Sequence, residues 1–529
     1  MSTVIVKQES IEGGISTTYF GDTKRGQYRI AFGVDPDITM STSNGDQYKM
    51  SNCIMPVGYT KFSSTEVDAY PIKWIIPPAS TEYVYCVLSN GKIVRYTSGL
   101  GTPTTVGTVT GNVANGAEYY NDYIYITTGT DVSRYGPLSG VAALTNTVWT
   151  GATLGALTAL GNAVTYPTIN GVPIPKHWMH SHVDGQLYFL DFIQGAGASG
   201  QGIVNVIRTT TTGTNNGSAY NVLDLPFGYY PTAITNYGTN IAITAIQTTG
   251  TTLRQGDAAL FLWDTISETF YQQITLPDVF ATAIQNVNGR LYVFTGSAQG
   301  ARVSLYEGGN SVSQVNFFDD GISVLPGAVT SYGDRVFFGA RMAYAGDNFY
   351  AVVLSYGSKQ NSIERVLHCP VKCTVAASAN NTCTAVIVAQ QASGSVPRVI
   401  AGWGNGTTYG LDKLGFNYTG NLPIFRTDVF EIGRKFKVKA LRYNTTIDTA
   451  VNTFEILPKL IFDNETATNT LSGKLGTSSL VYKRPEISQN SVIGNKNVLV
   501  EFEFYGTSQG GIQLPIILEI ETYDDQPIT

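Results

Sequence analysis

A short strand-forming unit recurs along most of this chain at a nearly constant spacing, and that spacing limits the folds that the chain can adopt. Each copy is a turn followed by an apolar segment, and most copies carry an aromatic residue within it. The equivalent positions are Tyr85, Tyr125, Tyr188, Ala242, Tyr292, Phe337 and Ala385, separated by 40, 63, 54, 50, 45 and 48 residues. The seventh copy is degenerate. A fixed period in a strand-rich chain indicates a repeat architecture.

A second unit follows the first by about ten to twenty residues, and in most repeats it ends in an aromatic residue before a turn. These aromatic residues are Tyr96, Tyr135, Trp263, Tyr306, Tyr356 and Trp403. The third repeat has Val204–Arg208 at this place and lacks the aromatic residue. Because two patterns keep the same phase, each repeat is expected to hold several short strands.

A period of 40 to 50 residues with several short strands per unit is typical of a β-propeller, whose blades are four-stranded sheets stacked around an axis. Seven units of about 50 residues need about 350 residues, and residues 60–415 supply 356. We therefore predict an all-β protein with a seven-bladed β-propeller at 60–415. A small sheet that is apolar on both faces buries them against its neighbours, so the repeated Tyr and Trp side chains are expected to pack between blades.

The residues after 415 alternate apolar and charged side chains over longer strands. These strands are expected around Phe436–Ala440, Phe454–Phe462, Val498–Phe504 and Ile516–Ile520. Glutamates such as Glu501 and Glu503 take the alternate positions, which predicts one buried face and one face in water. This pattern indicates antiparallel sheets packed on each other, and we predict a β-sandwich domain at 416–529.

The first 59 residues are too short to predict as a domain of their own. They contain a predicted strand at Gln27–Phe32 and a predicted turn at Asp35–Asp37. We predict an N-terminal extension at 1–59 that pairs with the sandwich or with a neighbouring molecule.

Composition excludes several classes of protein. Charged residues make up 14% of the chain against about 25% in an average soluble domain. The net charge of -6 and the pI near 5.4 give no overall basic field, so nucleic acid is not an expected partner. No apolar run is long enough for a membrane-spanning helix, and the first residues lack the pattern of an export signal. The five cysteines are too scattered for a disulfide framework, which favours reduced thiols.

Three of the four histidines lie within six residues, at His177, His180 and His182. In an extended segment His180 and His182 share a face, which is the geometry of a two-point metal ligand. These three residues are therefore the candidate metal ligands. The alternative is a polar loop that leads into the strand at Leu187. No other cofactor is expected.

Two familiar motifs occur in the wrong context. Gly195–Gly200 matches the dinucleotide-binding fingerprint but is followed by another predicted strand instead of a helix. Gly506–Gly510 matches the nucleophile elbow of hydrolases, yet strands are predicted on both sides and no histidine follows residue 368. The adjacent pairs Asp319–Asp320 and Asp524–Asp525 point to opposite faces of a strand, unlike glycosidase acids. We therefore expect no enzymatic activity.

A row of cations marks one strand of the predicted sandwich. Its members are Arg434, Lys435, Lys437, Lys439 and Arg442. Such a row is commonly a solvated face, and the alternative is a charged contact with another subunit or with a phosphate.

Several segments resemble tailed-bacteriophage virion proteins that combine a β-propeller with a β-sandwich in the tail or head-to-tail region. The resemblance is carried by the Gly-containing start Ile11–Ile15, the spaced glycines and aromatic residue at Gly21–Tyr28, Gly33–Asp35, and the segment Asn90–Tyr96. It covers the general plan of the whole chain. It implies a structural subunit that is repeated by symmetry in a particle, and no functional residue is carried across from the family.

The expected function is therefore a structural subunit of a bacteriophage virion, in the tail or associated with it. Its expected partners are other virion proteins and copies of itself, and its expected location is the virion, after synthesis in the host cytoplasm. The missing export signal and a composition typical of extracellular β proteins both favour this class. The first alternative is a binding module whose loops hold a host glycan or receptor through Tyr and Trp. A glycan hydrolase is the least favoured.

Overall fold

The structure is a computed structural model of the chain. It describes residues 2–10, 14–15, 27–40, 50–56, 58–61, 69–76, 83–97, 103–129, 131–150, 168–169, 172–173, 177–194, 200–249, 252–253, 258–297, 300–318, 324–343, 349–358, 365–376, 378–389, 397–415, 423–447, 455–463, 467–470, 475–476, 482–483, 486–488, 493–506 and 510–523. Within these residues the protein is all-β, as predicted, and a single 3₁₀ turn, Pro326–Ala328, is the only helix. No helix in this part of the chain has the length and apolar character needed to cross a bilayer. The chain forms two compact units, with unit 1 at 1–60, 354–374 and 414–529 and unit 2 at 61–353 and 375–413.

Seven successive antiparallel sheets, each with a path of four strands, account for most of the described residues before 416. The first has β7 (Ile72–Ile76), β8 (Tyr83–Leu88), β9 (Lys92–Thr97) and β10 (Thr104–Thr108). The second has β11 (Gly116–Tyr120), β12 (Tyr123–Thr127), β13 (Asp131–Gly136) and β14 (Ala143–Thr150). The third has β17 (Met179–Ser181), β18 (Leu187–Gln194), β19 (Gly200–Ile207) and β20 (Ala219–Phe227).

The remaining four sheets follow the same plan. The fourth has β21 (Tyr229–Tyr237), β22 (Asn240–Thr249), β24 (Ala259–Trp263) and β25 (Gln272–Thr275), with β23 (Thr252–Leu253) beside β22. The fifth has β26 (Phe280–Val287), β27 (Arg290–Ser297), β28 (Gly300–Tyr306) and β29 (Ser313–Phe318). The sixth has β30 (Val329–Tyr332), β31 (Arg335–Ala343), β32 (Phe349–Ser358) and β33 (Arg365–Lys372). The seventh has β34 (Thr382–Ala389), β35 (Arg398–Gly404), β36 (Tyr409–Gly415) and β6 (Gly58–Lys61), and a small hairpin joins β15 (Thr168–Ile169) to β16 (Val172–Pro173).

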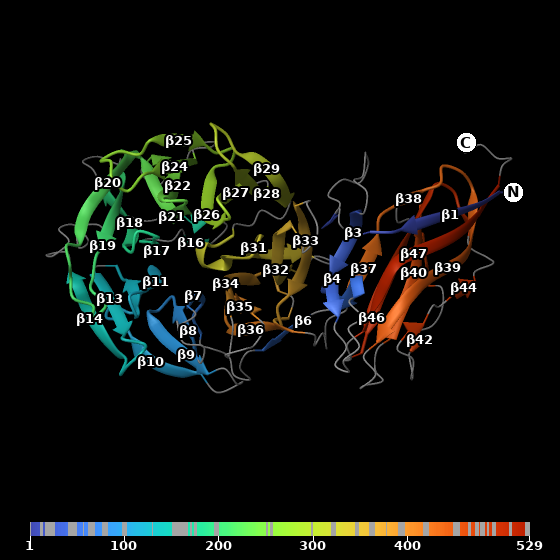
Figure 1. Cartoon of the computed structure of the whole chain (residues 1–529), viewed down its shortest axis with the longest axis horizontal. Helices are drawn as coiled ribbons and strands as arrows, with labels where there is room; N and C mark the ends of the chain where they lie inside the picture. The colour runs from blue at the N-terminus through green and yellow to red at the C-terminus, as the bar shows by residue number, and fades with distance from the viewer. Residues whose placement is uncertain are drawn as a thin grey trace. The chain divides into compact units, whose positions relative to one another are not determined.

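These seven sheets close into a ring, which is a β-propeller-like fold. The first strand of each sheet contacts the first strand of the next, in the order β7, β11, β17, β21, β26, β30 and β34, and β34 contacts β7 again. Figure 1 shows these strands around a common centre. The seventh sheet takes its fourth strand, β6, from the N-terminal part of the chain.

Most of the repeated aromatic residues are buried between neighbouring sheets, as predicted, whereas Phe337 and Tyr356 are only partly buried. Tyr125 and Tyr188 are 0% and 1% exposed, and Trp263 is 1% exposed. Tyr188 and Trp263 belong to a core cluster shared by the third and fourth sheets. Another cluster combines residues of the first and seventh sheets, including Tyr96 and Ala385. Burial on both faces of each sheet explains why the aromatic unit recurs once per sheet.

The degenerate seventh repeat lies on a different strand from the other six. In the first six sheets the unit falls on the second strand, as in β8 and β27, whereas in the seventh it falls on the first strand, β34. The prediction that Ala385 is equivalent to Tyr85 is therefore wrong by one strand. The seventh sheet needs only three strands from this region because β6 supplies the fourth.

Unit 1 contains two eight-stranded sheets. One follows the order β4 (Val34–Met40), β5 (Met50–Pro56), β47 (Gly510–Thr522), β39 (Phe436–Ile447) and β43 (Tyr482–Lys483), and β1 (Ser2–Gln8), β44 (Glu486–Ser488) and β45 (Ile493–Gly494) pair with it. The other follows the order β2 (Gly14–Ile15), β3 (Gln27–Phe32), β37 (Ile424–Thr427), β46 (Asn497–Tyr505), β40 (Glu455–Phe462) and β41 (Ala467–Thr470), and β38 (Phe430–Glu431) and β42 (Leu475–Gly476) pair with it. Both sheets contribute to one buried hydrophobic cluster.

The four long strands predicted in the C-terminal part are β39, β40, β46 and β47, and their apolar positions are buried. The prediction that Glu501 and Glu503 face water is wrong, because they are only 5% and 7% exposed. The Arg426 Nη2 atom lies 2.6 Å from a Glu501 carboxylate oxygen, and Lys459 pairs with both glutamates. Cation partners on the neighbouring strands therefore compensate for the burial of these carboxylates.

The N-terminal segment pairs with strands of the C-terminal part. β1 runs antiparallel to β47, and β3, which matches the predicted strand at Gln27–Phe32, runs antiparallel to β37. The predicted turn at Asp35–Asp37 is wrong, because these residues lie within strand β4. The pairing of β4 with β5 shifts between Asp35 and Ile38, and proline is tolerated at such an irregularity on an outer strand.

Candidate functional site

His177 is fixed in a buried position just before β17. Its backbone has a φ of 51°, in the left-handed region that residues other than glycine rarely adopt. Its carbonyl oxygen accepts a hydrogen bond of 2.9 Å from the hydroxyl of Thr127 in the second sheet. Its Nδ1 atom lies 3.0 Å from a carboxylate oxygen of Asp191, and both side chains are fully buried. This residue therefore joins the second sheet to the third.

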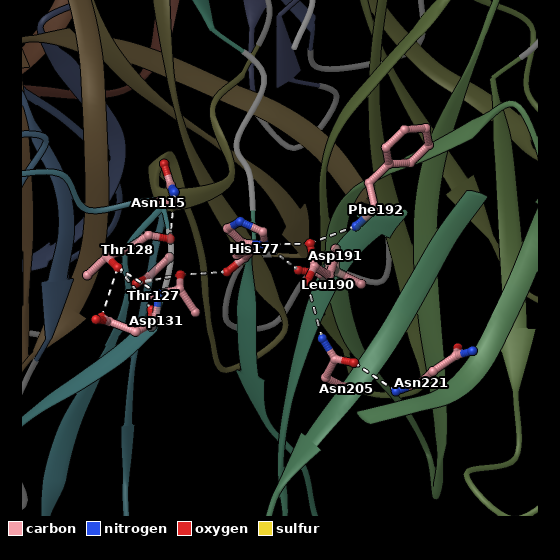
Figure 2. Close-up of polar contacts among 11 residues, drawn as sticks. Asn115, Thr127, Thr128, Asp131, His177, Leu190, Asp191, Phe192, Asn205 and Asn221 are labelled. Atoms are coloured by element: carbon pink, nitrogen blue, oxygen red, sulfur yellow. Dashed lines mark hydrogen bonds and ion pairs between the residues drawn. The ribbon is translucent and has the colours of Figure 1, made fainter. Parts of the chain in front are cut away.

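Asp191 continues this polar network through the third sheet (Figure 2). Its carboxylate accepts hydrogen bonds from the backbone N–H of Phe192 at 2.8 Å and from the side-chain amide of Asn205 at 3.4 Å. The amide oxygen of Asn205 accepts a hydrogen bond of 2.8 Å from the backbone N–H of Asn221. The chain of contacts thus crosses from β18 through β19 to β20.

A second group of contacts in Figure 2 holds the end of β12 in the second sheet. The side-chain amide of Asn115 donates to the carbonyl oxygen of Thr128 at 2.9 Å, and the hydroxyl of Thr128 donates to the Asp131 carboxylate at 2.9 Å. These bonds fix the segment beside Thr127, which in turn bonds to His177. The network ties neighbouring sheets together, and it leaves the buried Nε2 atom of His177 without a hydrogen-bond partner among the described residues.

His180 and His182 have partners different from those of His177. The Nε2 atom of His182 lies 3.2 Å from the carbonyl oxygen of Asn240, and its Nδ1 atom accepts a hydrogen bond of 3.4 Å from the backbone N–H of Asp184. His180 lies on β17 with its ring 6.3 Å from that of His182, centre to centre. Burial, together with the nearby His182, lowers the pKa of His180 to about 4.

The three predicted metal ligands therefore sit in two separate sets of contacts. His177 bonds to Asp191, whereas His182 bonds to the fourth sheet and to the turn after β17. Among the described residues, no three His, Cys, Asp or Glu side chains form a group that could hold a metal ion. Metal binding by His177, His180 and His182 stays a prediction.

A cavity of about 430 Å³ lies at the outer strands of the third sheet and the end of β24 in the fourth. Its lining residues are Tyr188, Arg208, Asn221, Val222, Leu223, Asp224, Trp263, Thr265, Ile266 and Glu268. This volume is within the range of about 300 to 1,000 Å³ that is usual for small-molecule pockets. The cavity is the second candidate site.

Local hydrogen bonds fix the walls of this cavity. The Tyr188 hydroxyl donates to the carboxylate of Asp184 at 2.7 Å, and both burial and this contact raise the pKa of Tyr188. The indole N–H of Trp263 donates to the carbonyl oxygen of Ser267 at 2.6 Å. The carboxylate of Asp264 accepts from the backbone N–H of Ser267 at 2.7 Å, which closes the turn that carries Glu268.

The sequence prediction named His177 as a metal ligand and Tyr188 and Trp263 as packing residues, but it missed the other residues of the two sites. Two of the missed residues left a signal. Asp191 interrupts the apolar run Leu187–Ile193, and Asn205 interrupts Ile203–Ile207. A polar residue inside a buried strand requires a partner, but the sequence does not say which residue supplies it. The cavity residues come from β18, β20 and β24, from Arg208 after β19 and from the turn after β24, and no local motif connects them.

The structure also places the two glycine motifs, the cation row and three of the cysteines. The strand predicted after the Gly195–Gly200 motif is β19, which begins at Gly200. Residues 195–199 lie outside the described residues, and so do Asp319–Asp320 and Asp524–Asp525. The predicted strands on both sides of the Gly506 motif are β46 and β47. In the cation row, Lys439 and Arg442 pair with Glu521 and Glu519. Cys86, Cys373 and Cys383 are buried.

No family model matches the chain, and no curated protein matches it. Among solved structures, the Myceliophteria thermophila Cps50 (Swd1) beta-propeller domain has a TM-score of 0.40 at 10% identity, covering 67% of this chain and 99% of that one. The Dos1 propeller has a TM-score of 0.37 at 6% identity, covering 71% and 82%. The computationally designed Ika8 protein has a TM-score of 0.37 at 10% identity, covering 66% and 98%. Similarity at this level carries no information about function.

Proposed function

We propose that this chain is a non-catalytic structural subunit of a tailed-bacteriophage virion, in the tail or associated with it. In this proposal the seven sheets of the ring are the seven blades of a closed propeller, and the two eight-stranded sheets are the layers of a β-sandwich. Its partners are other virion proteins and further copies of the chain. The resemblance of Ile11–Ile15 and Asn90–Tyr96 to phage virion proteins supports this class.

The observation that carries the proposal is the closed ring of small sheets. Each sheet contacts the next through its first strand, and the seventh contacts the first. Hydrophobic clusters lie between consecutive sheets, as between the second and third and the third and fourth. Stacking that buries each small sheet against its neighbours suits a rigid structural subunit.

The buried polar network supports a structural role over catalysis. His177 and Asp191 form a pair that recurs in hydrolases, but both side chains are fully buried. A general base must reach the proton that it abstracts. Hydrogen bonds from Thr127 to His177 and from His182 to Asn240 instead join the second, third and fourth sheets.

Mass spectrometry of purified phage particles from the source culture tests this proposal. We expect this polypeptide in the particles, at a copy number that matches a symmetric ring. A matched fraction of soluble lysate proteins serves as the control. Particles that infect normally and lack the polypeptide would overturn the proposal. Light scattering of the recombinant chain should also show a defined homo-oligomer under assembly conditions.

A further inference from the structure

The cavity beside β20 offers one fixed hydrogen-bond donor. The Arg208 guanidinium donates through Nη1 to the carbonyl oxygen of Gly217 at 2.9 Å and through Nε to the side-chain oxygen of Gln186. These two bonds hold the planar group in one orientation. Its Nη2 atom has no partner among the described residues, and Arg208 lines the cavity. A ligand oxygen could therefore accept from Nη2 without displacing either existing bond.

Two carboxylates supply acceptors in the same cavity. Asp224 on β20 and Glu268 in the turn after β24 both line it, and both are exposed. With Arg208 they give the lining a net charge of about -1. A charged ligand of either sign would therefore meet a like charge in the lining: an anion meets Asp224 and Glu268, and a cation meets Arg208.

Two aromatic rings are among the residues that line the cavity. Tyr188 and Trp263 pack edge to face, with ring centres 5.7 Å apart. Each is only 1% exposed, so the rings offer little stacking area. Recognition must therefore come mainly from the polar side chains of the lining.

We propose that this cavity binds one ring of a neutral saccharide. A sugar hydroxyl can donate a hydrogen bond to a carboxylate and accept one from a guanidinium at the same time. Asp224 and Glu268 then accept from hydroxyl groups, and Arg208 donates to a hydroxyl or ring oxygen. This site goes beyond the structural role above, since it would give the particle a means of contact with a glycan surface.

Saturation-transfer NMR on the full-length protein tests the site. The probes are the methyl α-pyranosides of D-glucose, D-galactose and D-mannose, with glucuronate as the anionic comparison. We expect at least one neutral glycoside to bind saturably, with a Kd on the order of 1 mM because the site is small and its rim is exposed. Arg208→Lys and Asp224→Asn should each weaken binding about tenfold or more.

Glu431→Gln is the matched control, since it removes an exposed carboxylate on β38, outside the cavity. Thermal melting of every variant checks that the fold is retained, and Asp224→Asn changes only an exposed side chain. Tighter binding of glucuronate than of every neutral glycoside would overturn the proposed ligand class. No saturable binding by any glycoside, or binding that both cavity variants leave unchanged, would overturn the site. Either failure leaves the virion proposal to be decided by the particle analysis.

Discussion

The two units of this protein bury their apolar residues in different ways. In unit 1, two eight-stranded sheets share one continuous cluster that includes Phe436, Phe502 and Leu518. In unit 2, separate clusters lie between consecutive sheets, as between the second and third and the third and fourth. In unit 1, a change at one buried residue therefore affects a core to which both large sheets contribute. In unit 2, it affects only the two sheets that share the cluster.

The buried polar groups of the two units also have partners in different places. In unit 1 the buried carboxylates of Glu501 and Glu503 are neutralised by cations on adjacent strands of their own sheet. In unit 2 the buried polar bonds cross from one sheet to the next, as from Thr127 to His177. Polar contacts thus strengthen a sheet in one unit and join sheets in the other.

The largest expected effect comes from truncating the shared core. Phe502→Ala removes a fully buried ring that packs 4.9 Å from the Tyr443 ring, centre to centre. It should lower the free energy of unfolding by about 3 to 5 kcal/mol. Calorimetry should show that the transition of unit 1 moves to lower temperature. Phe261→Ala, which truncates a buried ring of unit 2, should move the other transition. If both variants shift both transitions equally, the two cores are not independent.

Removing one partner of the buried ion pair should cost nearly as much. Arg426→Ala leaves Glu501 buried with only the Lys459 amine, 3.7 Å away, and should destabilise unit 1 by about 3 kcal/mol. Arg442→Ala is the matched control, because the Arg442–Glu519 pair has a similar length but is more exposed. It should cost less than about 1 kcal/mol. Urea unfolding measures the loss of stability in both variants. Equal losses would show that burial does not determine how much these ion pairs contribute to stability.

A single methyl group tests the contact between the second and third sheets. Gly116 lies on β11 against the backbone carbonyl of His177, so the Cβ of Gly116→Ala would overlap that oxygen. Overpacking against backbone should cost about 1 to 3 kcal/mol. Gly140→Ala is the control, because its Cβ would have only an ordinary contact of 3.5 Å with Pro137. Hydrogen exchange should quicken in β11 and β17 of the Gly116 variant, and unchanged protection would contradict the contact.

The repeat in unit 2 could be predicted from sequence because the second strand of six sheets carries the same local pattern. The closing strand β6 could not, since Gly58–Lys61 is separated from its sheet by the whole ring. The alternation in β46 correctly placed Phe502 inside. It could not show that Glu501, on the opposite face, is buried too, because alternation assigns a side chain to a face and says nothing of what else lies on that face. The pairing of His177 with Asp191 could not be predicted either, because it depends on the tertiary structure.

The smallest expected effect is a change in the pH dependence of stability. It concerns a carboxylate of unit 2 that, unlike Glu501 and Glu503 in unit 1, has no cation partner among the described residues. This carboxylate, Glu118 on β11, accepts a hydrogen bond from the backbone N–H of Tyr119. Burial raises its pKa from 4.5 to about 7. The folded state therefore holds a proton that the unfolded state releases, and this contribution to stability is lost as pH rises from 4.5 to 7.

His180 on the neighbouring strand β17 acts in the opposite direction. Its pKa falls from 6.5 to about 4 on burial, so the unfolded state binds the proton first and stability is lost as pH falls from 6.5 to 4. Between pH 4.5 and 6.5 the two contributions oppose each other. Glu118→Gln removes one of them, and the stability of that variant should rise with pH across this window by up to about 1 kcal/mol per pH unit. His180→Gln should show the reverse slope. Melting temperatures from pH 4 to pH 7 measure both, and parallel curves for the two variants would show that neither group changes its proton affinity on folding.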